Sequence, residues 1–87
     1  MKTNFDKLIK EIYTFEKKAG FDKTPKKTLT NWLQKELNNY KKAKSKPKKE
    51  NKLSDMIVLI MQIAIRENIS LDKAWKIHWK KSQKYLK

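Results

Sequence analysis

An apolar run in the second half of the chain most limits how this sequence can fold. Residues 56–65 contain nine apolar residues and Gln62, in a chain of 87 residues with a net charge of +14. The run is far shorter than the ~20 residues that cross a bilayer. A helix that is apolar on nearly all sides belongs in the middle of a bundle or at a subunit interface. We therefore expect this segment to be the central helix of an all-α protein and to contact a second copy of the chain.

Apolar residues recur at helical spacing in four segments, close to residues 5–19, 25–40, 53–67 and 71–86. Residues that are preferred at the start of a helix occur at Asn4, Thr24-Pro25 and Ser70. Gly20 and Asn68 are residues that readily take the left-handed backbone conformation with which helices often end. The pattern predicts a four-helix bundle that forms one domain over residues 1–87.

Residues 41–51, KKAKSKPKKEN, interrupt this pattern with six Lys and Pro47. Such a composition is typical of a solvated linker between two helices, with a frayed helix end. We therefore predict a Lys-rich linker at about 41–51.

The positive charge is concentrated in two places. Residues 41–52 and 73–87 each carry a net charge of +6, whereas residues 53–72 carry −2. Such a field attracts polyanions, although abundant lysine could equally serve solubility alone. The candidate polyanion-binding residues are Lys41, Lys42, Lys44, Lys46, Lys48, Lys49, Lys73, Lys76, Lys80 and Lys84. Trp79 and Tyr85 lie among the last of these lysines and are candidates for stacking on bases, with packing as the alternative.

Two acidic residues fall on faces that are otherwise apolar. Glu36 lies between Leu33 and Leu37, and Asp55 begins a stripe that continues through Gln62. A buried carboxylate is costly unless it is paired or binds a cation. Asn39 follows Glu36 by one turn and Lys52 precedes Asp55 by one turn. One interpretation is that Glu36 pairs with Lys52 while Asp55 caps the third helix; the other is a site for a hard cation such as Mg²⁺.

Three segments resemble the all-α, MazG-like nucleoside triphosphate pyrophosphohydrolases, and together they span most of the chain. They are IYTFEKKAGFDKTPKKTL, LQKELNNYKKA and KLSDMIVLIMQIAIRENISLDKAW. The resemblance implies a four-helix fold, assembly as a dimer or tetramer, and acidic residues that hold Mg²⁺ while a nucleoside triphosphate is cleaved to its monophosphate and pyrophosphate.

The sequence departs from that family at the metal ligands. Residues 35–39, KELNN, stand where the family has Glu-Glu-x-x-Glu, and residues 52–55, KLSD, stand where it has Glu-x-x-Asp. Only Glu36 and Asp55 remain of the four core ligands that the resemblance implies, and Asn39 offers a neutral oxygen. Lys52 cannot ligate Mg²⁺ while it is charged, and its ammonium group could take the ion's place. The other cleft residues that the resemblance implies are Lys35, Gln62, Lys81 and Ser82, of which Lys81 and Ser82 match the family's nucleotide-binding Lys-Asn pair inexactly.

These observations favour a non-catalytic MazG-like protein that binds a nucleotide or nucleic acid through a degenerate cleft and a lysine-rich surface. Two alternatives remain open: an active Mg²⁺-dependent pyrophosphohydrolase, and a small regulator or inhibitor, of the kind that a phage or mobile element encodes, that binds another protein. No cofactor is expected apart from Mg²⁺ if activity is retained. We expect a homo-oligomer in the cytoplasm that does not bind a membrane.

Overall fold

The computed structural model describes residues 3–86, and every regular element in that range is helical. The elements are α1 (Phe5–Ala19), α2 (Lys26–Lys42), α3 (Lys46–Glu67), α4 (Leu71–Ser82) and a short 3₁₀ helix, η1 (Gln83–Tyr85). The predicted all-α class and the four helices are confirmed.

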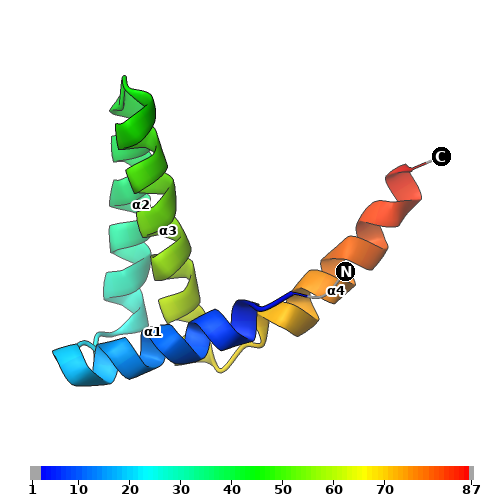
Figure 1. Cartoon of the computed structure of the whole chain (residues 1–87), viewed down its shortest axis with the longest axis horizontal. Helices are drawn as coiled ribbons and strands as arrows, with labels where there is room; N and C mark the ends of the chain where they lie inside the picture. The colour runs from blue at the N-terminus through cyan, green and yellow to red at the C-terminus, as the bar shows by residue number, and fades with distance from the viewer. Residues whose placement is uncertain (1–2, 87) are drawn as a thin grey trace.

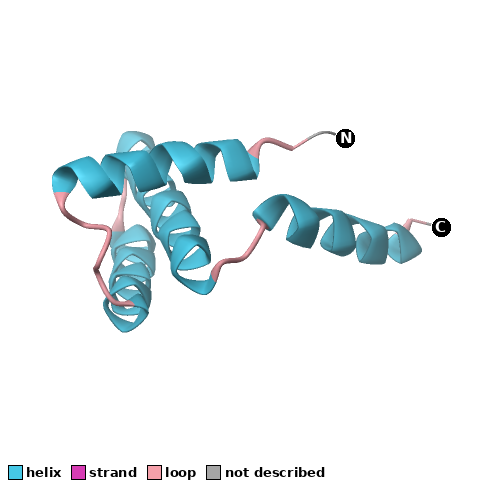
Figure 2. Cartoon of the chain, turned by 90° about the horizontal axis from the view of Figure 1, so that it is seen from below, coloured by secondary structure: helices cyan, strands magenta, loops and turns pink. Residues whose placement is uncertain are grey.

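The helices α2 and α3 form an antiparallel hairpin, and α1 crosses the base of that hairpin (Figure 1). The helix α4 leaves the same base and extends away from the hairpin, so that the chain has two diverging arms. Figure 2, seen from below, shows α1 lying across the hairpin while α4 extends away from it on one side. The four helices therefore do not close into a bundle within one chain.

The prediction of a linker at residues 41–51 is wrong. The turn between α2 and α3 contains only residues 43–45, and α3 begins at Lys46 instead of near residue 53. The hydroxyl of Ser45 accepts a hydrogen bond from the Lys48 amide at 3.4 Å and caps the helix. Pro47 is tolerated because a residue in the first turn needs no intrahelical N–H bond. Lysine is a good helix former, so the charge run extends two helices instead of separating them.

The other helix ends agree with the sequence in part. Gly20 and Asn68 adopt the left-handed conformation, with φ of 83° and 55°, and the Ser70 hydroxyl accepts a hydrogen bond from the Lys73 amide, as expected. The side chain of Asn4 makes no capping hydrogen bond. Pro25, not Thr24, takes the N-cap position of α2, and the first helical residue is Lys26.

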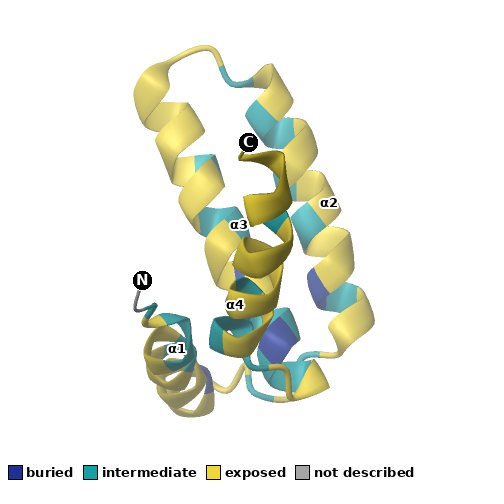
Figure 3. Ribbon diagram, turned by 90° about the vertical axis from the view of Figure 1, so that its right-hand side faces the viewer, coloured by how far each residue is buried: buried dark blue, intermediate teal, exposed yellow. Residues whose placement is uncertain are grey.

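The core of one chain is small (Figure 3). Leu29, Leu59, Met61 and Ala64 are the buried hydrophobic residues among those described. The apolar run at residues 56–65 contributes three of them, yet Ile57, Val58 and Ile60 in the same run are 41–54% exposed. None of the residues of α4 is buried, so the apolar face of this helix is covered only in part within the chain.

Candidate functional site

An open pocket of about 480 Å³ lies between α2 and α3, close to the end of α1. Its apolar lining is Phe15, Phe21, Trp32, Val58 and Leu59, and its polar lining is Lys35, Glu36, Asp55 and Gln62. The antiparallel pairing of α2 and α3 brings the polar residues together, although they are up to 27 positions apart in the sequence.

Lys52 occupies the position between the two carboxylates of this pocket. Its ammonium nitrogen donates to Glu36 Oε2 at 3.2 Å and lies 3.9 Å from Asp55 Oδ2. Asn39 Nδ2 donates to Glu36 Oε1 at 3.2 Å. The pairing of Glu36 with Lys52 is therefore present, whereas Asp55 lies in the middle of α3 and does not cap it.

The pKa values of the two carboxyl groups are shifted in opposite directions. Burial opposes the ionisation of Glu36, but hydrogen bonds with Lys52, Asp55 and Asn39 outweigh it, so the pKa of Glu36 is below its usual value of 4.5. Burial and the adjacent Glu36 carboxylate raise the pKa of Asp55 above its usual 3.8, and the more distant Lys52 offsets this only in part. The surroundings therefore favour the ionised form of Glu36 and disfavour the ionised form of Asp55.

These residues do not fit a magnesium ion. Mg²⁺ requires near-octahedral oxygen ligands at 2.0–2.1 Å, but the ammonium group of Lys52 stands where the ion would have to contact Glu36. Asn39 directs its amide nitrogen, not its oxygen, at that carboxylate. Within residues 3–86, no three acidic or histidine side chains converge closely enough to hold a metal.

The remaining residues expected in the cleft divide into two groups. Lys35 and Gln62 line the pocket. Lys81 and Ser82 lie on α4 instead, and neither lines this pocket. The Ser82 hydroxyl donates to the His78 carbonyl of its own helix at 3.0 Å, so a single chain does not bring this pair to the carboxylates.

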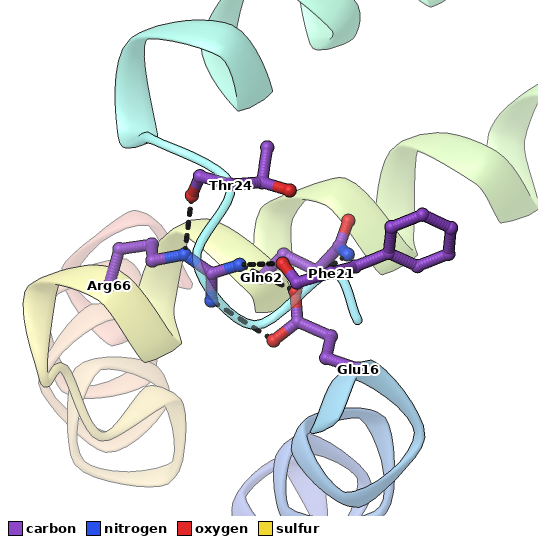
Figure 4. A network of polar contacts seen from close by, with 5 residues as sticks. All are labelled: Glu16, Phe21, Thr24, Gln62 and Arg66. Atoms are coloured by element: carbon purple, nitrogen blue, oxygen red, sulfur yellow. Dashed lines mark hydrogen bonds and ion pairs between the residues drawn. The ribbon is translucent and has the colours of Figure 1, made fainter. Parts of the chain in front are cut away.

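A buried ion pair beneath the pocket was not expected from the sequence (Figure 4). Glu16 is fully buried and accepts hydrogen bonds from Arg66 Nη1 at 3.0 Å and Arg66 Nη2 at 2.7 Å. Gln62 Nε2 donates to the same carboxylate at 2.8 Å. Arg66 also donates to the backbone carbonyls of Thr24 and Phe21 at 2.7 and 2.8 Å. The network ties α1 and the α1–α2 loop to α3.

Two signals in the sequence could have revealed this network. Glu16 continues the apolar face of α1 one turn after Ile12, and Arg66 is the one arginine in a chain that otherwise uses lysine. Arginine is the cation suited to bidentate pairing with a buried carboxylate. Gln62 is held by the network, which fixes its position at the edge of the pocket.

The candidate polyanion-binding lysines form two separate surfaces, and all ten are exposed. The hairpin lysines lie at the end of α2, in the turn and at the start of α3: Lys41, Lys42, Lys44, Lys46, Lys48 and Lys49. The α4 lysines lie along the second arm: Lys73, Lys76, Lys80 and Lys84.

The aromatic residues near the α4 lysines have different surroundings. Trp79 stacks on Trp75 with 6.0 Å between ring centroids and an angle of 22°, yet it is 45% exposed. Tyr85 is 78% exposed, and the Lys84 ammonium lies 5.4 Å from the centre of its ring. Tyr85 is therefore accessible for stacking on a base, while one face of Trp79 is already occupied.

No protein-family model, curated protein or solved structure matches this chain. Within the part of the chain that the structure describes, none of the helices has the length and apolar character needed to span a bilayer.

Proposed function

We propose that this chain is a MazG-like protein that no longer catalyses hydrolysis and that binds a phosphate-rich ligand, with nucleic acid favoured over a free nucleotide. The observation that carries the proposal is the position of Lys52, whose ammonium contacts Glu36 and lies near Asp55. An internal cation there takes the place of the metal on which phosphate-cleaving enzymes rely to neutralise charge and activate water.

The charges in the pocket favour the lysine surfaces over the cleft as the place where phosphates bind. A phosphate in the pocket would meet the carboxylates of Glu36 and Asp55, and Lys52 is already paired with Glu36. The hairpin lysines and the α4 lysines are instead exposed, and all except Lys44, which is in the turn, lie on helices. Charges on helices are already positioned, so a ligand that binds them orders little backbone.

The proposal includes self-assembly as a homo-oligomer, a dimer or a tetramer. Fifteen large apolar side chains among residues 3–86 are at least 38% exposed, whereas four hydrophobic residues are buried. Four of the exposed side chains, Phe15, Phe21, Trp32 and Val58, lie together around the pocket, and a contiguous apolar patch is typical of an interaction site. The same surface favours a second candidate function, which is a regulator that binds another protein.

Two measurements on the purified protein test the proposal. Fluorescence anisotropy with labelled DNA and RNA should show binding at about 50 mM salt that weakens steeply toward about 200 mM. Incubation with a panel of nucleoside triphosphates and Mg²⁺ or Mn²⁺ should release no pyrophosphate. Metal-dependent release of pyrophosphate would overturn the loss of catalysis. Failure of both nucleic acids to bind at the lower salt concentration would overturn the nucleic-acid ligand and favour the regulator.

A further inference from the structure

The two diverging arms enclose a groove whose walls are almost entirely apolar. The groove has a volume of about 330 Å³. Its principal lining residues are Ile57, Ile60 and Met61 on α3 and Leu71, Trp75 and His78 on α4. On α3 the apolar stripe continues to Leu53, one turn before Ile57, and Leu53, Ile57 and Ile60 are 45–54% exposed.

The helix α4 is held to the rest of the chain only near its first turns. Trp75 packs edge-to-face on Phe5 with 5.9 Å between ring centroids, and Asp72 bonds to the start of α1. Beyond that point Trp79, Tyr85 and Leu86 are 45–78% exposed. A helix of 12 residues is only marginally stable in water without tertiary packing, so the far half of α4 needs a partner.

The charge on α4 is arranged so that self-association does not bury it. Trp75, His78 and Ser82 lie on the groove side of the helix, because residues three and four apart share a face. Lys73, Lys76, Lys80 and Lys84 follow the same spacing on the opposite side, together with Ile77. Two copies with this charge can therefore meet along their grooves while their α4 lysines remain in solvent.

The exposed area is close to what a stable dimer needs. A stable interface buries about 800 Å² on each partner, and a buried aromatic residue contributes roughly 150–250 Å². The side chains that line or extend the groove are 45–78% exposed, so about half or more of each is available to an interface: Leu53, Ile57, Ile60, Trp79, Tyr85 and Leu86. The groove and its continuation along α4 are thus large enough for a second copy, not merely for a small ligand.

We propose that the α3/α4 groove is filled by a second copy of this chain across a two-fold axis, so that the α4 of each copy lies between α3 and α4 of the other. This inference rests on the proposed self-assembly and names its surface. A two-fold interface requires a self-complementary patch, and the groove, with an apolar helix on each wall, provides one.

Two pairs of lysine substitutions test the groove, each comparing two nearby residues on different sides of one helix. Ile60→Lys changes the groove side of α3, and Val58→Lys changes the side toward the pocket; these residues are 45% and 41% exposed. His78→Lys changes the groove side of α4, and Ile77→Lys changes its lysine side. Because the four side chains are exposed in one chain, far-UV circular dichroism at high concentration should show that each variant remains helical.

Sedimentation equilibrium measures the result. The unmodified protein should be a dimer, and Ile60→Lys and His78→Lys should each weaken dimerisation by at least about 100-fold, as loss of a central apolar contact does. The control variants Val58→Lys and Ile77→Lys should remain dimeric. A dimer that survives either groove variant, or that dissociates with a control variant, overturns the groove but leaves self-assembly intact. A monomeric unmodified protein overturns both.

Discussion

Asp6 and Asp72 each cap the helix to which the other belongs. The Asp72 carboxylate accepts hydrogen bonds from the backbone amides of Phe5 and Asp6, at 3.0 and 3.3 Å. The Asp6 carboxylate accepts from the Ser70 hydroxyl at 2.7 Å and the Asp72 amide at 3.3 Å. The N-termini of α1 and α4 therefore meet, and two carboxylates satisfy the amides and the partial positive charges of both.

These reciprocal hydrogen bonds make the attachment of α4 to α1 dependent on pH. Hydrogen bonds from Thr3, Asp6 and Phe5 hold the pKa of Asp72 below its ordinary value of 3.8, with Thr3 contributing most. Folding thus favours the ionised carboxylate. Its stabilisation is complete above pH 3.8 and is lost as the pH falls through the lower pKa of the folded state.

Asp72→Ala should lower the melting temperature at neutral pH, and the difference from the unmodified protein should shrink as the pH falls below about 4. Thermal melts followed by circular dichroism across that range measure this. Glu50→Ala, which removes an exposed carboxylate from the first turns of α3, is the control and should leave the melting temperature nearly unchanged. A difference that stays constant at every pH would show that the charge of Asp72 has no part in the effect.

A second prediction concerns the buried pair of Glu16 and Arg66. Removing one partner of a buried ion pair leaves an uncompensated charge and costs about 3–5 kcal/mol. Arg66→Ala should therefore destabilise the fold by about that amount in urea denaturation, because Glu16 is fully buried and the Arg66 side chain is only 13% exposed. The control is Lys26→Ala, which removes the exposed partner of Glu67 and should cost about 1 kcal/mol or less. Similar losses from the two variants would contradict a Glu16 carboxylate that is dry and dependent on Arg66.

The same pair shows where sequence reasoning stopped. Helical spacing predicted the apolar faces and the ends at Gly20 and Asn68, because these depend on residues that are close in the chain. The packing of Arg66 on Glu16 joins residues 50 positions apart, and periodicity carries no information about such a contact. Glu16 breaks the apolar stripe of α1 in the same way as Glu36 breaks that of α2. A carboxylate at such a position predicts a cation that pairs with it.

The candidate site followed from the sequence only in part. The pairing of Glu36 with Lys52 was one of two interpretations that the spacing left open, and the structure contains it, whereas Asp55 does not cap α3 and Lys81 and Ser82 do not line the pocket. The prediction failed at residues 41–51, where lysine content was interpreted as solvated coil. Lysine favours the helix, and a serine cap followed by Pro47 starts one. The position of α4 could not be predicted either, because an apolar stripe shows that a face must be covered but not which chain covers it.

A third prediction introduces a metal site. Replacing Lys52 and Asn39 together with Glu should remove the internal ammonium group and place four carboxylates around the present positions of Glu36 and Asp55. Isothermal titration should then detect Mg²⁺ or Mn²⁺ binding that the unmodified protein lacks, since hard cations prefer such oxygen ligands.

The matched control makes the same change of net charge on the exposed surface nearby. Lys49→Glu with Asn51→Glu adds two carboxylates and removes one lysine on the first turns of α3. Comparable binding by the control would indicate a diffuse effect of charge, and binding by the unmodified protein would contradict the interpretation of Lys52 as a substitute for the ion.

The last prediction separates specific phosphate contacts from general attraction. Lys76 and Lys80 lie one turn apart on the lysine side of α4 and are exposed. Each phosphate of duplex DNA that a lysine neutralises steepens the logarithmic salt dependence of binding by about 0.9. Replacing both with Ala should therefore weaken DNA binding and flatten that slope by roughly two units, with little change in sequence preference. Lys7→Ala with Lys10→Ala removes the same charge from exposed positions of α1, a helix that carries none of the candidate polyanion-binding lysines, and should flatten the slope much less. Since the hairpin lysines also lie on helices, Lys46→Ala with Lys49→Ala should have an effect comparable to that of the α4 pair if a ligand bridges both arms. An effect of the α4 pair alone would limit the contact to α4, and equal slopes for all three pairs would refute a defined phosphate-binding surface.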